Sequence, residues 1–498
     1  MRPARTVPLP AGFGIAFDPE TRFVGPDDLF GGSPPRLLRL SAAGVRALEE
    51  LRGGPVGSLD SGRLARRLTD TGLAHPRPPG GSPPAEVTVV IPVRDRAAGL
   101  ERCLAALGTG YPVIVVDDGS ADPGPTADVC RRHGARLVRR PAPGGPGPAR
   151  NDGLALVTTP LVAFVDSDCA AGPDWIVRLG AHFADPMVGA VAPRVRPQTG
   201  DGAVGRYLAA RAPIDLGPDE ARVAPLTRLS YVPTAALLVR IGAIPSGGFD
   251  PGLRFGEDVD LVWRMIGAGW RVRYDPGAEV RHVEPDLWSA VLARRLRYGS
   301  SAAPLARRHP GQVPPLILQA WPAAAVAALL AGRPVTALAA YTAGTRQLVR
   351  LLRDWGVPAR GVLGPMADSV QQTWLGAGRW SVQYALPVVA GGLAWPGGRP
   401  RSRIRRRLAL ASLVLGPPAA EWLRRRPRLD PVRFTLGYLA DEAAYGAGVY
   451  RGAVTERLAA PLLPRLAWRP LPRPARPSRP SRPSRLARTR AHRPAPLP

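Results

Sequence analysis

The chain has 498 residues, of which 45% are apolar, enough for two to four domains and a large buried core. Its 67 basic residues outnumber the 39 acidic ones, giving a net charge of +28, and every basic residue is arginine. Schiff-base chemistry on an internal amine and P-loop phosphate binding both need lysine, so the composition excludes both.

Residues 1–75 are expected to form a small winged-helix-like α+β module, because the stretch 76–86 that follows has the proline and glycine content of a linker. The module begins without a continuous apolar run, so we expect no signal peptide. Its expected elements are a strand over 36–40, a helix over 42–51 capped by Ser41, and an amphipathic helix over 62–73. This order resembles the peptide-recognition domains of ribosomal-peptide maturation systems. A compact all-helical cap would give the same pattern.

Residues 87–311 have the pattern of a nucleotide-binding α/β domain. Short apolar runs at 87–93, 113–119 and 161–168 alternate with amphipathic helices of the right length for crossovers. Such runs are typical of parallel strands covered on both faces, so we expect a Rossmann-like sheet. Ligands of these sheets bind at the carboxyl ends of the strands, which makes acidic residues after an apolar run candidate site residues.

Carboxylates follow two of these runs. Asp117 and Asp118 end the run in VVDDGS, and Asp166 and Asp168 end the run in VAFVDSD. Two carboxylates separated by one small residue can hold Mg²⁺ or Mn²⁺, although the same triplet is common on surfaces without a function. Asp118 can accept hydrogen bonds from a nucleobase or a ribose hydroxyl, and an Asx-turn or helix cap explains it equally well.

Three further features add candidate ligands. The loop 144–156 leads into a helix whose backbone N–H groups and Arg150 can face an anion. His282 follows a strand and can serve as a further metal ligand, although a lone histidine usually does not. A later helix opens with three carboxylates, Glu257, Asp258 and Asp260. The helix dipole tolerates them there, and alternatively one of them is a general base.

Taken together, VVIPVRDR, VVDDGS, ARNDGL, VAFVDSD, GEDVDL and the later histidine resemble the inverting family-2 glycosyltransferases of the GT-A fold, in that order over about 200 residues. The resemblance implies nucleotide-sugar contacts from Pro92, Asp117, Asp118, Arg150 and Asp166. It implies a Mg²⁺ or Mn²⁺ site formed by Asp166, Asp168 and His282, with Asp258 as the catalytic base. No covalent intermediate is expected, and the sugar inverts.

Nearly the whole chain before the C-terminal tail is similar to the glycosyltransferases of the mycofactocin system, including the segment 294–311. This similarity implies transfer of glucose from UDP-glucose onto a peptide-derived mycofactocin precursor, which builds a short β-linked oligoglucan. The expected contacts to acceptor and diphosphate are Glu257, Arg294, Arg297 and Tyr298. The last three match the spacing of the QxxRW element of processive enzymes, with Arg in place of Gln and Tyr in place of Trp. A cell-wall polysaccharide or lipid acceptor is the alternative.

Residues 312–464 are expected to be helical. Their apolar segments, 316–344 and 383–420, are interrupted by arginine and proline, so neither contains a clean transmembrane run. The arginines between 399 and 407 favour contact with an anionic membrane surface, and an ordinary helical subdomain is the alternative. We therefore expect the chain at the cytoplasmic face of the membrane or in the cytoplasm. A reducing cytoplasm fits the cysteine content, because the three cysteines form no CxxC pair. They are Cys103, Cys130 and Cys169.

Residues 465–498 are rich in arginine and proline, and we expect a disordered tail. One interpretation is that the tail attracts an anionic partner, either lipid or nucleic acid. The alternative is that it has no partner. Specific nucleic-acid binding would need aromatic residues among the basic ones, and the tail has almost none, so any such binding would be non-specific. A sugar nucleotidylyltransferase generally needs a glycine-rich loop with a catalytic lysine, and this chain has no lysine.

Overall fold

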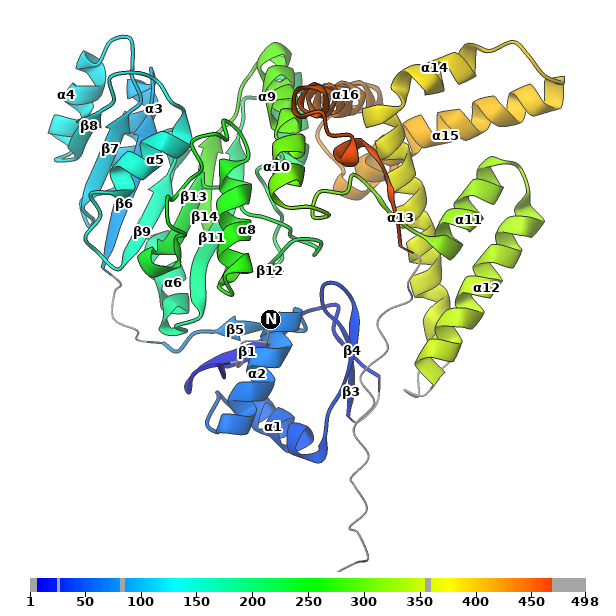
Figure 1. The fold of residues 1–498 in the computed structure, drawn as a ribbon, viewed down its shortest axis with the longest axis horizontal. Coiled ribbons are helices and arrows are strands. Elements are labelled where there is room, and N and C mark those ends of the chain that lie inside the picture. Colours follow the sequence, from blue (N-terminus) through cyan, green and yellow to red (C-terminus); the bar gives the residue numbers. More distant parts are fainter. Residues whose placement is uncertain (1–6, 25–26, 81–85, 173, 354–359, 468–498) are drawn as a thin grey trace, which may run out of the picture.

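The computed structural model describes residues 7–24, 27–80, 86–172, 174–353 and 360–467. Along the chain, a small N-terminal module is followed by a domain built on one large sheet and then by a set of long helices (Figure 1).

Nine strands form the large sheet, in the order β10-β14-β11-β13-β9-β6-β7-β8, with β12 paired to β14. The strands are β6 (Val87–Val93), β7 (Val113–Asp117), β8 (Arg136–Arg139), β9 (Leu161–Val165), β10 (Cys169–Ala170), β11 (Val188–Gln198), β12 (Ala221–Val223), β13 (Ala236–Arg240) and β14 (Arg271–Val283). β8, β7, β6 and β9 are parallel, whereas β13 runs antiparallel between β9 and β11. The expected α/β sheet is confirmed. His282 lies within β14 instead of after it.

Both faces of this sheet are covered by helices, because side chains alternate across each strand. Val89 and Ile91 of β6 pack in one apolar cluster with α3 and α6, and Val90 packs in a second cluster with α5 and α8. The helices of this domain are α3 (Ala97–Leu107), α4 (Gly124–Arg132), α5 (Pro146–Leu154), α6 (Asp174–Gly180), α7 (Ala203–Arg211), α8 (Glu257–Gly267), α9 (Trp288–Ser300) and α10 (Ala302–Arg308). Short 3-10 turns lie at Ala181–Ala184 and Ile241–Ala243.

The N-terminal module has an apolar core of its own. Its elements are β1 (Gly14–Phe17), β2 (Arg22–Phe23), β3 (Asp28–Gly31), β4 (Arg36–Arg39), α1 (Ala42–Gly53), α2 (Leu59–Thr71) and β5 (Ala74–Arg77). β2, β3 and β4 form one small sheet, and β1 pairs with β5 in another. Ser41 caps α1 as expected, by accepting a hydrogen bond from the Gly44 N–H at 3.2 Å. The second helix begins at Leu59, three residues earlier than the sequence pattern indicates, because Ser58 and Ser61 form a capping box.

In the described residues of the C-terminal part there are six helices: α11 (Ala320–Leu330), α12 (Pro334–Leu352), α13 (Arg360–Tyr384), α14 (Leu386–Ala394), α15 (Pro400–Arg425) and α16 (Pro431–Glu456). A 3-10 turn follows at Ala460–Leu462. α16 packs along α9 and thereby joins the helices to the sheet domain. In the described part of the chain, no helix combines the length and the hydropathy that crossing a membrane requires.

Two expected boundaries differ from the structure. The linker was expected from residue 76, but β5 extends to Arg77 because it completes a sheet with β1; residues 81–85 of the linker lie outside the described residues. The tail was expected from residue 465, but β16 (Arg465–Ala467) pairs in parallel with β15 (Ile317–Gln319). The tail prediction for 468–498 lies outside the described residues.

Candidate active site

The candidate residues gather at the carboxyl ends of β6, β7 and β9. From β6 the chain first adds β7 and β8 on one side and then returns to place β9 on the other side. The order of strands therefore reverses between β6 and β9, which is where open α/β sheets form a ligand crevice. Asp166 and Asp168 follow β9 at this point, and Arg96 follows β6 and forms an ion pair with Asp168.

Asp118 fastens the loop that runs from β8 into α5. Its carboxylate accepts hydrogen bonds from the backbone N–H groups of Gly144, at 2.9 Å, and Gly145, at 2.7 Å, and forms an ion pair with Arg140. The turn after Asp118 requires Gly119, whose φ is +70° and whose added Cβ would lie 2.9 Å from the Pro143 nitrogen. The Asx-turn alternative applies to the neighbouring Asp117, which accepts the Ser120 N–H at 2.9 Å and is fully buried.

Arg150 of α5 joins two of the candidate carboxylates. Its guanidinium donates to Asp166 at 2.6 Å and to Glu257 at 3.0 Å, and it lies over the ring of Phe249, 5.4 Å from the centroid. Arg150 and Glu257 are both buried, so their ion pair is shielded from water, whereas the Asp166 side chain is 30% exposed. This contact brings the start of α8 next to the end of β9.

A second chain of contacts orients His282. β10 pairs with β14 so that Cys169 lies opposite His282, which places the imidazole Nε2 3.4 Å from Asp168. Its other nitrogen, Nδ1, lies 3.0 Å from Glu284, which in turn forms an ion pair with Arg294. Burial alone would lower the pKa of His282, but Glu284 and then Asp168 raise it.

These contacts bring together two of the three expected metal ligands. Asp168 and His282 come together, whereas Asp166 contacts Arg150. Among the residues that the structure describes, no three histidine, cysteine, aspartate or glutamate side chains are grouped closely enough to hold a metal ion.

The three carboxylates of α8 differ in environment. Burial and the neighbouring Asp258 raise the pKa of Glu257 to about 7, and burial also raises the pKa of Asp258. Asp258 accepts a hydrogen bond from the Val259 N–H at 2.8 Å. Asp260 lies elsewhere, between Arg264 at 2.7 Å and His309 at 2.8 Å. The geometry therefore separates Asp260, which connects α8 to the end of α10, from the two carboxylates at the sheet edge.

Comparison with known proteins identifies the family. The family model "Glycosyl transferase family 2" matches residues 88–241. The chain is 40% identical over 480 residues to the "Pre-mycofactocin glycosyltransferase" of Mycobacterium tuberculosis, which covers 92% of this chain and 98% of that protein. The chain belongs to the family 2 glycosyltransferases.

One shorter sequence similarity is to a protein of the same class. An uncharacterized glycosyltransferase of M. tuberculosis is 34% identical over 188 residues, covering 37% of this chain and 81% of that protein. Two solved structures are also similar. One is a mannosyltransferase from Pyrobaculum calidifontis in complex with GDP-Man and Mn²⁺, with 18% identity, 74% and 88% of the two chains covered and a TM-score of 0.42. The other is S. aureus TarS, with 16% identity, 45% and 43% covered and a TM-score of 0.33.

The other expected contacts of this glycosyltransferase lie on two elements. Pro92 lies buried in β6, and α9 carries Arg294, Arg297 and Tyr298. The side chains of Arg297 and Tyr298 are exposed, whereas Arg294 is held by Glu284. The expected roles of these residues toward diphosphate and acceptor stay predictions.

Three residues of the glycosyltransferase site were missed at the sequence level. Arg96 and Arg140 are two of 67 arginines, and no spacing marked them as partners of Asp168 and Asp118. Glu284 carried a signal that could have been used, because it lies two residues after His282 and side chains two apart along extended backbone share a face.

Proposed function

We propose that this glycosyltransferase transfers glucose from UDP-glucose, with inversion and with a divalent cation, onto a peptide-derived pre-mycofactocin acceptor, and that repeated transfer builds a short β-linked oligoglucan. The similarity over 92% of the chain to a pre-mycofactocin glycosyltransferase supports the acceptor. The observation that carries the reaction is the Arg150 bridge, because it places the opening of α8 beside the carboxylates after β9.

On the donor side, we assign the nucleotide to the edge formed by Asp117, Asp118 and the loop that Asp118 holds. A carboxylate can accept about four hydrogen bonds, and Asp118 receives its present ones from Gly144, Gly145 and Arg140. The Asp118 carboxylate can therefore accept a further hydrogen bond from an N–H or hydroxyl of the nucleoside. Arg96, whose side chain is largely exposed, and Arg140 supply positive charge for the diphosphate.

Asp168 and His282 fit a divalent cation. A histidine whose other ring nitrogen is held by a carboxylate is a common arrangement for a metal ligand, and Glu284 holds Nδ1 in this way. Bound there with diphosphate oxygens, Mg²⁺ or Mn²⁺ would neutralise the leaving group. Asp166 contacts Arg150 through Oδ1 only, which leaves Oδ2 to join the cation.

For the acceptor we assign Asp258 as the general base. Its raised pKa strengthens it as a proton acceptor, while Arg150 and the helix N-terminus keep its charged form accessible. Asp258 removes the proton from the acceptor hydroxyl as that oxygen attacks the sugar's anomeric carbon. As the new bond to the acceptor oxygen forms, the bond to the diphosphate breaks and UDP leaves, and the sugar inverts because one displacement takes place.

The test separates a base from a structural residue. Asp258→Asn should lower turnover by roughly 10²–10⁴-fold, measured as product by mass spectrometry, while UDP-glucose binding by calorimetry stays nearly unchanged. Asp260→Asn is the matched control on the same helix and should retain turnover in whatever fraction stays folded. If binding and turnover collapse together in Asp258→Asn, the residue has a structural role and the assignment fails.

The metal and the acceptor have separate tests. Asp168→Asn should remove most activity that Mg²⁺ or Mn²⁺ restores to the chelated wild-type enzyme, and near-wild-type turnover would refute the site. Mass spectra of products from UDP-glucose and a pre-mycofactocin peptide product should show successive additions of one hexose. Transfer to a cell-wall polysaccharide or lipid, with none to the peptide-derived compound, would favour the alternative acceptor.

A further inference from the structure

A groove of about 670 Å³ lies among the C-terminal helices, between α11, α12, α13 and α15. In Figure 1 these helices stand to the right of the sheet domain, and the residues that line the groove include none of the candidate site residues. The groove's wall is mainly apolar and includes Val326, Leu330, Tyr341, Val370, Trp374 and Leu408. It is open to solvent, since Leu408 is 65% exposed. An open apolar groove of this size suits a flexible apolar ligand better than a sugar.

Arginine lies along one rim of this groove. Residues 316–420 contain 12 arginines and 2 acidic residues. Arg405 lines the groove, and Arg401 lies one turn earlier on the same face of α15, because residues four apart on a helix share a face. Neither side chain has a hydrogen bond or ion pair with a described residue.

The neighbouring arginines behave differently. Arg406 donates to the Gly392 carbonyl at 2.9 Å, and Arg407 donates to the Leu393 carbonyl at 3.0 Å, so both brace the connection between α14 and α15. The α15 sequence therefore divides its positive charge into arginines that support the fold and arginines that face solvent at the groove. Arg401 and Arg405 leave a positive rim that can bind an anionic group.

Large apolar side chains are exposed around the same helices. Val388 is 76% exposed on α14, Trp395 is 63% exposed after it, and Ile404 is 58% exposed on α15. A tryptophan beside arginines is the combination that favours the boundary between lipid headgroups and acyl chains.

We propose that this groove binds an acyl chain of an anionic phospholipid at a membrane surface, with the lipid phosphate held by Arg401 and Arg405. The apolar wall matches the acyl chain, the unpartnered arginines match the phosphate, and Trp395 and Ile404 lie where the bilayer surface would be. The site is separate from the sheet edge, so it does not depend on the proposed sugar transfer. It gives the enzyme a means of working at a membrane.

The first experiment measures lipid charge dependence with the full-length protein. Binding to phosphatidylcholine vesicles with and without phosphatidylglycerol is followed by sedimentation, and phosphatidylglycerol should strengthen binding by about tenfold or more. The double variant Arg401→Glu/Arg405→Glu should lose that gain. Arg424→Glu/Arg428→Glu, an equal charge change at and just beyond the far end of α15, should keep it. Because all variants retain residues 468–498, any adsorption through the arginine-rich tail cancels. Equal binding to both vesicle types, or equal loss in both double variants, would overturn the proposal.

The second experiment locates the acyl chain. Phosphatidylglycerol with brominated acyl chains should quench Trp374 inside the groove, so Trp374→Phe should lose more of the quenching than Trp422→Phe, whose ring packs near α7 and α16. Ala409→Trp, which fills the groove, should reduce the quenching while circular dichroism confirms folding. Quenching that is identical in both phenylalanine variants would mean surface adsorption only. A dimer that Ala409→Trp dissociates would make a second copy the occupant. Either result would overturn the proposal.

Discussion

The sheet domain has one interface with the N-terminal module and another with the C-terminal helices. These two interfaces, the N-terminal seam and the C-terminal seam, are built differently. The N-terminal seam joins the N-terminal module to β12, β14 and the segment after α6, and the C-terminal seam joins α16 to α7 and α9. Both contain buried arginine–carboxylate pairs. They differ in what surrounds those pairs.

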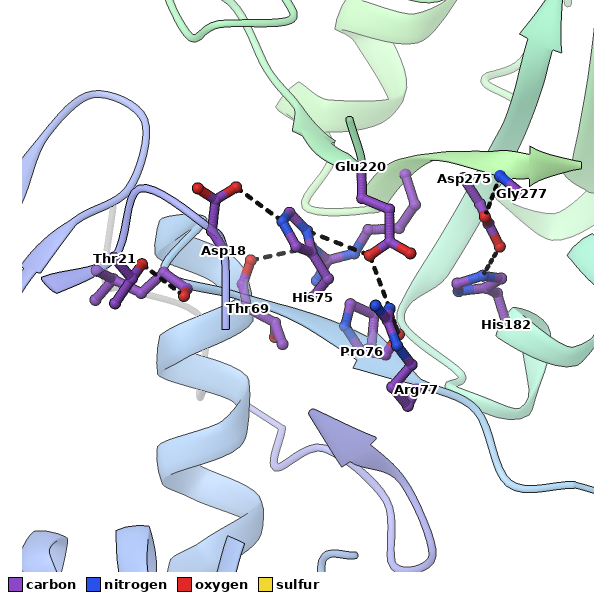
Figure 2. Close-up of polar contacts among 12 residues, drawn as sticks. Asp18, Thr21, Thr69, His75, Pro76, Arg77, His182, Glu220, Asp275 and Gly277 are labelled. Atoms are coloured by element: carbon purple, nitrogen blue, oxygen red, sulfur yellow. Dashed lines mark hydrogen bonds and ion pairs between the residues drawn. The ribbon is translucent and has the colours of Figure 1, made fainter. Parts of the chain in front are cut away.

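Ion pairs dominate the N-terminal seam. Arg66 of α2 is bonded through both terminal nitrogens to Asp185 at 2.7 Å, and Arg271 of β14 contacts Asp70 at 2.9 Å. Figure 2 shows His75 of β5 beside Asp18, at 2.9 Å, with Glu220 of the sheet domain facing it at 3.9 Å. The apolar cluster of the module contains only its own residues, so the module's core does not continue across the seam.

The C-terminal seam is built around an apolar cluster that both sides share. Tyr207 of α7 and Val291 of α9 pack with Phe434 of α16. α9 and α16 approach so closely that a Cβ on Gly448 would lie 2.0 Å from the Leu296 carbonyl oxygen. Within this packing, Glu442 is completely buried. Its partners are Arg211, Arg379 and Gln383.

This difference indicates which of the two, the N-terminal module or the C-terminal helices, can be altered without affecting sugar transfer. A module with its own core keeps its fold when the seam charges are altered, whereas helices that share a core with α9 do not. α9 also carries Arg294, which holds Glu284 behind His282. The C-terminal seam is therefore connected to the active site through α9, whereas the N-terminal seam meets β14 at Arg271, at the opposite end of that strand from His282.

The largest effect should follow from Glu442→Ala. This change removes a completely buried carboxylate from the buried Arg211 and the half-exposed Arg379, and it should destabilise the protein by about 3–5 kcal/mol in denaturant unfolding, with loss of sugar transfer as α9 shifts. Glu456→Ala is the matched control, because its pair with Arg307 is exposed and should contribute at most about 1 kcal/mol. Wild-type turnover in folded Glu442→Ala would show that α9 is not coupled to the site.

Arg66→Leu should have a comparable or smaller effect, confined to the N-terminal seam. It leaves Asp185 buried without its partner, which should cost about 3 kcal/mol and expose α2 to hydrogen exchange. Turnover of UDP-glucose with water as the acceptor should stay unchanged, because the site residues are not disturbed. Loss of that turnover would contradict the separation of the two seams.

Acid should loosen the seams at different pH values. Burial lowers the pKa of His75 below 6.5, in spite of the opposing hydrogen bond with Asp18, so the unfolded chain binds that proton more readily and the N-terminal seam loses stability as the pH falls below 6.5. Burial alone would raise the pKa of Glu442, but Arg379, Arg211 and Arg295 lower it to about 2. Its contribution is therefore full above 4.5 and is lost only as the pH falls toward 2.

Hydrogen exchange of α2 and α16, corrected for the intrinsic rate at each pH, measures this order. α2 should lose protection first, and His75→Gln should remove the pH dependence near 6.5. Simultaneous loss of protection in both helices would contradict the assignment of the His75 pH dependence to the N-terminal seam.

The smallest effect should come from Arg77→Ala. Arg77 contacts Glu220 at 2.7 Å, but its side chain is 48% exposed, so the pair should contribute at most about 1 kcal/mol. The same denaturant titration used for Arg66→Leu checks this value. A loss as large as that of Arg66→Leu would mean that the exposed rim, and not the buried pair, holds the seam.

The sequence by itself determined the sheet and the gathering of carboxylates at its edge. The buried runs ending in Asp117 and Asp166 are parallel strands, and parallel strands end at the same edge of a sheet, so local pattern was sufficient to bring their acidic residues together. The opening of α8 by Glu257 and Asp258 was equally predictable, because helix starts have local signals.

Only the tertiary structure decided which side chains meet across elements. Arg150 could have paired with any carboxylate, and its joining of Asp166 to Glu257 depends on how α5 and α8 pack on one face of the sheet. The contact of Arg211 with Glu442 spans 231 residues, and the groove beside Arg405 exists only because four helices pack around it. With 67 arginines and 39 acidic residues, composition permits very many pairs, and the packing of apolar faces selects among them.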